Sequence, residues 1–192
     1  MDAVDLPDLP TLRERWRTLA IAAHACSMPD LWTSTVDSDT HADPIGSGLE
    51  LLALRSQAAV LTGFDYELPD DMMFVDTALL VDGAPSWVRT AVEEVAPLGD
   101  AVWWDGTGWF RSSAAAGLAS AVDILAVALT SPEGMADELL TLVESDQYAD
   151  RAAALEYAAN PTPEGLVRLY GEGRRYGFEP DHADAAFEVY AR

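Results

Sequence analysis

The segment AVWWDGTGWF, residues 101–110, constrains the fold most, because it places bulky aromatic side chains on both sides of a turn. The Asp-Gly turn predicts a β-hairpin in which Trp104 lies opposite Trp109. In the same register Trp103 lies opposite Phe110. Neighbouring residues of a strand point to opposite faces, so each face of this ribbon carries an aromatic pair. Either helices cover both faces, or one face is a binding surface anchored by tryptophan.

The heptapeptide WWDGTGW resembles the W-W/Y-D-G-x-x-W turn of a small actinobacterial module of unknown function. The Gly-Trp-Tyr-Pro-Asp-Pro start that accompanies the turn in that module is missing from this chain. We interpret the likeness as a shared turn, and it implies no function.

A helix is predicted near the start of the chain. Thr11 and Glu14 form a T-x-x-E capping box, so the helix should begin near Leu12. Its apolar residues fall on one face at helical spacing: Leu12, Trp16, Leu19, Ala23 and Cys26. Cys26 is therefore predicted to fill the core and not to act as a nucleophile.

The middle of the chain mixes a loop, a helix and a strand. The polar segment 28–46 predicts a long loop. Ser47 and Glu50 repeat the capping signature before GLELLALRSQAAVL, which predicts a helix with a strand as the alternative. The segment 73–81 predicts a strand, and Ser86 predicts the cap of a short helix.

The second half of the chain is predicted to be helical. Residues 113–130 are apolar nearly all round, which predicts a central buried helix. Ser131-Pro132 and Thr162-Pro163 predict two further helix starts, since proline suits the first turn. Another helix is expected over about 146–159, and a last short one from Pro180.

Together these elements predict an α+β fold. Residues 1–112 form a mixed, acidic half with a short strand and the aromatic hairpin. Residues 113–192 form a four-helix half packed on it, and we expect residues 1–192 to be a single domain.

The charge excludes several functions. The chain has 33 acidic residues and 11 basic ones, all of them arginine, for a formal charge of −22. Without lysine it cannot carry a Schiff-base lysine or the lysine of a phosphate-binding loop. The negative charge disfavours direct binding to nucleic acid or to anionic membranes. Residues 26–110 are the most unbalanced, with 15 acids and two arginines.

Cysteine usage and the start of the chain bear on location. The single cysteine forms no internal disulfide, and the sequence has no C-x-x-C pair and no cofactor-binding motif. The acidic start MDAVDLPDLP is unlike a signal peptide. We therefore expect a cytoplasmic protein, of bacterial or haloarchaeal composition, without a cofactor.

A metal site is the alternative suggested by the segment DSDTHAD. Its alternating ligand types do not follow the calcium-loop pattern, because Ala42 and Gly48 stand where glycine and glutamate are required. The D-x-D resembles the nucleophile motif of haloacid-dehalogenase-type phosphatases, but the buried strand and the lysine are missing. A two-His, two-carboxylate site would comprise His41, Asp43, His182 and Asp184. Asp123 is a further candidate if it is buried.

The leading hypothesis is a non-enzymatic module that docks a basic protein partner. An immunity protein or antitoxin, a DNA-mimic inhibitor and a secretion chaperone all fit this description. No catalytic residue is predicted. The predicted partner-binding residues are Trp103, Trp104, Trp109, Asp37, Asp39, Asp70 and Asp71. The alternatives are a small metal-assisted hydrolase using the Asp/His loop, and an acid-rich halophilic domain whose charge only solvates it. The oligomeric state stays open.

Overall fold

The chain has an α+β fold that divides into two compact units. The computed structural model describes residues 1–35, 38–42, 47–55, 58–65, 75–93, 99–118, 120–143, 149–171, 173–175 and 178–190. Unit 1 comprises Met1–Pro10 and Thr35–Ala126, and unit 2 comprises Thr11–Ser34 and Val127–Arg192. Each unit is therefore built from two separate segments of the chain. The single domain expected from the sequence stays a prediction.

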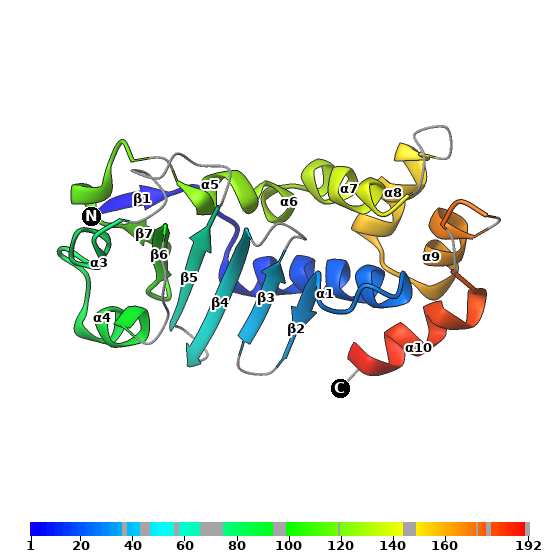
Figure 1. The fold of residues 1–192 in the computed structure, drawn as a ribbon, viewed down its shortest axis with the longest axis horizontal. Coiled ribbons are helices and arrows are strands. Elements are labelled where there is room, and N and C mark those ends of the chain that lie inside the picture. The colour runs from blue at the N-terminus through cyan, green and yellow to red at the C-terminus, as the bar shows by residue number, and fades with distance from the viewer. Residues whose placement is uncertain are drawn as a thin grey trace. The chain divides into compact units, whose positions relative to one another are not determined.

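Unit 1 is organised around an antiparallel sheet (Figure 1). Six of its described strands belong to unit 1, in the order β1-β7-β6-β5-β4-β3. Their bounds are β1 (Asp2–Val4), β3 (Ser38–Ala42), β4 (Gly48–Arg55), β5 (Ala58–Phe64), β6 (Asp100–Trp104) and β7 (Trp109–Arg111). The central strand β5 is buried along its whole interior, and its Leu61 pairs with Leu51 of β4.

The helix predicted from Ser47 is wrong, because this segment forms β4 and β5. A short, nearly continuous apolar run suits a strand buried on both faces as well as a buried helix, so periodicity does not separate the two. The Ser47 hydroxyl donates to Asp65 Oδ1 at 3.0 Å instead of capping a helix. The alternative that the sequence allowed, a strand, is the one observed.

Two other predictions for the middle of the chain are also corrected. The segment 28–46, expected to be a loop, contains β3, in which Asp39 and His41 are buried. The expected strand at 73–81 contains the short helix α3 (Thr77–Leu80). Asp76 caps this helix by accepting from the Ala78 backbone N–H at 2.9 Å, a local signal that outweighs the apolar run.

Helices complete the core of unit 1. They are α3, α4 (Ser86–Glu93), the 3-10 turn η1 (Ser113–Ala115) and α5 (Ala121–Leu125). Leu80, Val88 and Ala115 pack with Trp103 in one buried cluster. A Cβ at Gly63 would lie 3.0 Å from the Cβ of Ala121, so the absence of a side chain there allows α5 to approach β5 closely.

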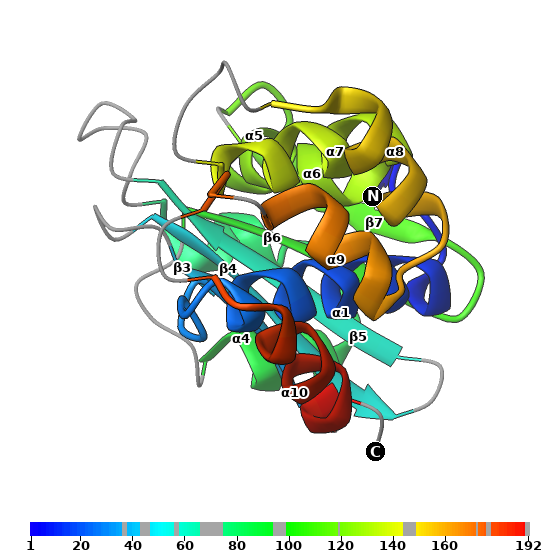
Figure 2. The ribbon, with the colours of Figure 1, turned by 90° about the vertical axis from the view of Figure 1, so that its right-hand side faces the viewer.

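The described part of unit 2 is helical apart from one short strand, and Figure 2 shows its helices. Its elements are α1 (Leu9–Ala25), β2 (Trp32–Ser34), α6 (Val127–Thr130), α7 (Pro132–Thr141), α8 (Arg151–Ala159), α9 (Pro163–Tyr170) and α10 (Pro180–Tyr190). From α6 onward each helix packs against the next one in the chain. In the part of the chain that the structure describes, no helix combines the length and apolar character needed to cross a bilayer.

Several helix predictions for unit 2 are confirmed. The Ser131 hydroxyl accepts from the Gly134 N–H at 3.0 Å, and Thr162 accepts from the Gly165 N–H at 3.1 Å. All five apolar residues of the predicted α1 stripe, Cys26 included, are buried. The helix expected over about 146–159 begins at Arg151 and is capped by Asp150.

The single helix predicted over 113–130 is wrong. This segment forms η1, α5 and α6, with interruptions that have local causes. Gly117 adopts a φ of 86°, which does not fit a helix. Ser120 has extended backbone and caps α5 by accepting from the Asp123 N–H at 2.9 Å.

Gly134 in α7 provides a test of the packing in unit 2. A Cβ at this position would overlap the backbone carbonyl oxygen of Val127. Alanine normally favours a helix by about 1 kcal/mol over glycine, but overpacking costs about 1–3 kcal/mol. We expect Gly134→Ala to lower the free energy of unfolding by urea. The exposed control Glu133→Ala should change it by less than about 1 kcal/mol, and a stabilising Gly134→Ala would contradict the packing of α6 against α7.

Candidate functional site

The aromatic hairpin has the predicted register, with Trp103 paired to Phe110 and Trp104 to Trp109. Trp103 is 1% exposed and belongs to the core cluster of unit 1. Trp109 is 2% exposed, and its Nε1 donates to the Pro7 carbonyl at 2.6 Å. Two of the three tryptophans predicted to bind a partner thus pack inside their own unit.

The hairpin turn is fixed by the exposed Asp105. Its carboxylate accepts from the Thr107 hydroxyl at 2.7 Å and from the Thr107 N–H at 2.8 Å. These bonds stabilise the charged form and lower the pKa of Asp105. Gly106 follows with a φ of 99°, a conformation that favours glycine.

A polar cluster joins β6, β7 and α5 through four side chains: Asp100, Arg111, Ser120 and Asp123. Arg111 forms a bidentate ion pair with Asp123, with nitrogen–oxygen distances of 2.7 and 2.8 Å. The same guanidinium lies 3.4 Å from Asp100 Oδ2. The Ser120 hydroxyl donates to Asp100 and accepts from Arg111 at 3.0 Å.

The carboxyl group of Asp100 is the buried member of this cluster. Its side chain is 6% exposed, whereas that of Asp123 is 53% exposed. Burial raises the pKa of Asp100, although the bond from Ser120 and the charge of Arg111 oppose the rise. Asp123 lies on the solvent side and is paired, so it does not have the burial that would have made it a site candidate. The cluster contains two carboxyl groups, a hydroxyl and a guanidinium that bond mainly to one another, and this arrangement is suited to holding α5 on the sheet.

Sequence reasoning missed Asp100 and Arg111. They belong to different strands, and Arg111 lies twelve residues before Asp123. One signal was available: Arg111 is the only basic residue between positions 90 and 150, where many carboxylates compete for it.

The structure places Asp39 and His41 on β3, opposite Leu51 and Leu49 of β4. Both side chains are buried, with exposures of 0% and 9%. The other predicted residues of this acidic region lie outside the described residues: Asp37, Asp43, Asp70 and Asp71.

His182 and Asp184 lie on α10 in unit 2, whereas His41 belongs to unit 1. His182 stacks edge-on with Phe178, and its Nδ1 lies 3.4 Å from the Glu179 N–H. Among the residues with described positions, no three His, Cys, Asp or Glu side chains gather as metal ligands.

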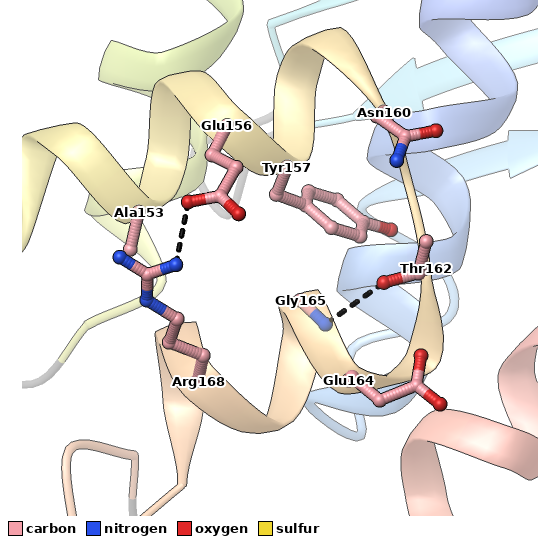
Figure 3. A pocket seen from close by; sticks show the side chains of 8 residues that line it. All are labelled: Ala153, Glu156, Tyr157, Asn160, Thr162, Glu164, Gly165 and Arg168. Carbon is pink, nitrogen blue, oxygen red and sulfur yellow. Dashed lines mark hydrogen bonds and ion pairs between the residues drawn. The ribbon is translucent and has the colours of Figure 1, made fainter.

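A hollow of about 170 Å³ lies between α8 and α9 (Figure 3). On one side Arg168 pairs with Glu156 at 2.5 Å, and both side chains are more than half exposed. The ring of Tyr157 lines the hollow. It packs closely on Gly165, where an added Cβ would lie 3.0 Å from the ring. Its hydroxyl is buried and has no hydrogen-bond partner among the described residues.

Comparison with known proteins adds no relative. No protein-family model matches the sequence, and neither the curated proteins nor the solved structures gave a significant match. The functional argument therefore rests on the geometry and charge of this chain.

Asp100 and Asp105 should respond to pH with opposite signs. Because the pKa of Asp100 is raised on folding, its contribution to stability is complete below its ordinary value of 3.8 and is lost as the pH rises through the folded-state pKa. The pKa of Asp105 is lowered, so its contribution is present above 3.8 and is lost as the pH falls through the folded-state pKa. Relative to the native protein, Asp100→Asn should therefore gain stability as the pH rises, while Asp105→Asn should lose it. Urea unfolding between about pH 3 and pH 7 measures both, and parallel slopes for the two variants would refute the assignment.

Two buried tyrosines among the described residues of unit 2 form a matched pair. The Tyr170 hydroxyl donates to the Leu139 carbonyl at 2.9 Å, whereas the Tyr157 hydroxyl has no described partner. Removing a buried, unpaired hydroxyl relieves its desolvation cost, so Tyr157→Phe should raise the free energy of unfolding by about 1 kcal/mol. Tyr170→Phe should lower it by about 1 kcal/mol. Equal losses in both variants would show that the Tyr157 hydroxyl is hydrogen-bonded.

Proposed function

We propose that this protein is a non-enzymatic interaction module that docks a basic protein partner through unit 1. The observation that carries the proposal is the charge of that unit. Residues 1–10 and 35–126 contain 18 acidic residues and three arginines, a formal charge of −15. The remaining residues contain 15 acids and eight arginines, a charge of −7, so the imbalance belongs mainly to unit 1.

The described side chains show where this charge is displayed. Among the described residues of unit 1, eight carboxylates are exposed: Asp2, Asp5, Asp8, Asp76, Asp82, Glu93, Asp105 and Asp123. Arg111, by contrast, is 16% exposed and bound to Asp100 and Asp123. The unit thus uses a cation internally and presents mainly anions to solvent.

An excess of surface charge of one sign favours a partner of the other sign. Complementary potentials speed association and select against like-charged competitors, which here include nucleic acids and anionic lipids. An immunity protein or antitoxin, a DNA-mimic inhibitor and a secretion chaperone all fit this description. A cytoplasmic setting is part of the proposal. Because Trp103 and Trp109 are buried, the exposed carboxylates support docking and these two rings do not.

The test compares two variants that remove equal charge from the two units. The unit 1 variant carries Asp5→Asn, Asp76→Asn, Asp82→Asn and Glu93→Gln. The unit 2 variant carries Glu133→Gln, Glu164→Gln, Asp181→Asn and Asp184→Asn. All eight positions are exposed, so both variants should fold. Each immobilised protein is exposed to a native lysate at low salt and eluted with a salt gradient.

We expect the native protein and the unit 2 variant to retain the same basic protein in stoichiometric amount, and the unit 1 variant to bind it about tenfold more weakly. At 0.1 M salt, interactions between exposed charges are largely screened beyond about 10 Å. The complex should therefore dissociate as the salt concentration rises. Equal retention by both variants, or retention equal to that of an unrelated protein of the same charge, would show that only net charge matters and would overturn the proposal.

A further inference from the structure

The short helix α3 presents an apolar side chain to solvent between two carboxylates. Leu80 is 1% exposed and packs in the core cluster, whereas its neighbour Leu79 is 44% exposed. Asp76 and Asp82 flank the helix and are both exposed. The α3 surface is therefore apolar in the middle and negative at both ends.

The helix α3 packs against η1, and in Figure 1 α3 and β1 lie at the same end of unit 1. The turn η1 thus lies next to α3. Just after η1, the backbone N–H of Leu118 donates to the Ala115 carbonyl at 3.1 Å. The side chain of Leu118 is 41% exposed. The Ser113 hydroxyl donates to Asp2 Oδ1 at 2.8 Å and so joins η1 to β1. We name this surface the α3 patch and define it as Asp2, Asp76, Leu79, Asp82 and Leu118.

The charge of the α3 patch limits what can cover it. The segments 2–4, 75–82 and 113–118 contain three carboxylates and no basic residue, and Arg111 lies opposite Asp2 alone in the register of β1 and β7. A second copy of this chain, with a net charge of −22, would be repelled, and so would nucleic acid or an anionic bilayer. A cationic protein segment meets no such repulsion.

We infer that the α3 patch is where the basic partner docks, and that the partner contributes a segment in which arginine or lysine alternates with apolar side chains. This inference rests on the proposed function. The cations lie against Asp2, Asp76 and Asp82, and the apolar side chains cover Leu79 and Leu118. Charge then increases the rate of association, while the covered leucines slow dissociation.

The experiment uses two peptides of about ten residues, an alternating Arg-Leu peptide and an alternating Arg-Ser peptide, with equal charge and blocked ends. Their affinities at low salt are measured by fluorescence anisotropy for three proteins. These are the full-length native chain, the patch variant Leu79→Ser/Leu118→Ser and the control variant Ile124→Ser/Val189→Ser. The control positions are 49% and 53% exposed and lie outside the α3 patch, so both variants change only exposed aliphatic side chains.

We expect the Arg-Leu peptide to bind the native chain at least tenfold more tightly than the Arg-Ser peptide. The patch variant should lose this preference, and the control variant should keep it. A preference that survives in the patch variant, or that the control variant loses, overturns the inference. If both peptides bind every protein equally, docking of basic segments stands and the α3 patch is excluded as its place. If neither peptide binds the native chain, the proposed function fails as well.

Discussion

The polar cluster around Arg111 is the interaction on which the architecture of unit 1 depends. Ser120 caps α5 with its hydroxyl oxygen and donates its hydroxyl proton to Asp100, so one side chain both starts the helix and attaches it to β6. Arg111 adds the link to β7. A buried carboxylate is costly unless it is paired, and Arg111 with Ser120 provides that pairing. Gly63, opposite Asp100 in the register, leaves the room that α5 needs.

This arrangement has a consequence for the surface. Because Arg111 is paired with Asp100 and Asp123, the mutual repulsion of the remaining exposed carboxylates of unit 1 must be balanced by the core. The hairpin supplies part of that balance: Trp103 and Trp109 are nearly fully buried, and burial of each large apolar side chain contributes about 1.5–3 kcal/mol. The aromatic residues thus stabilise the unit that displays the charge.

Whether an interaction could be predicted from the sequence depends on how far apart its partners lie along the chain. Ser131 and Thr162 each bond to an N–H three residues away, so their caps are readable from a few residues, and both were predicted. The hairpin register is similarly local. The strands β4 and β5 were predicted as a helix, because their apolar run is explained only by burial between other elements. The Asp100–Arg111 pair depends on the alignment of two strands and a helix, so no local pattern reveals it. Within the candidate docking surface, the acidic excess could be predicted, but the exposure of Leu79 beside the buried Leu80 could not.

The separation between buried tryptophans and exposed leucines also bears on how such a module would bind. Tryptophan anchors usually dominate stable interfaces, and here Trp103 and Trp109 are committed to the core. An interface built from carboxylates and two partly exposed leucines gains most of its selectivity from charge, and charge acts mainly on the rate of encounter. Such an interface selects among partners by their electrostatic potential, before close contact is made. Unit 1 is suited to that order of events, since the exposed carboxylates that the structure describes already face solvent.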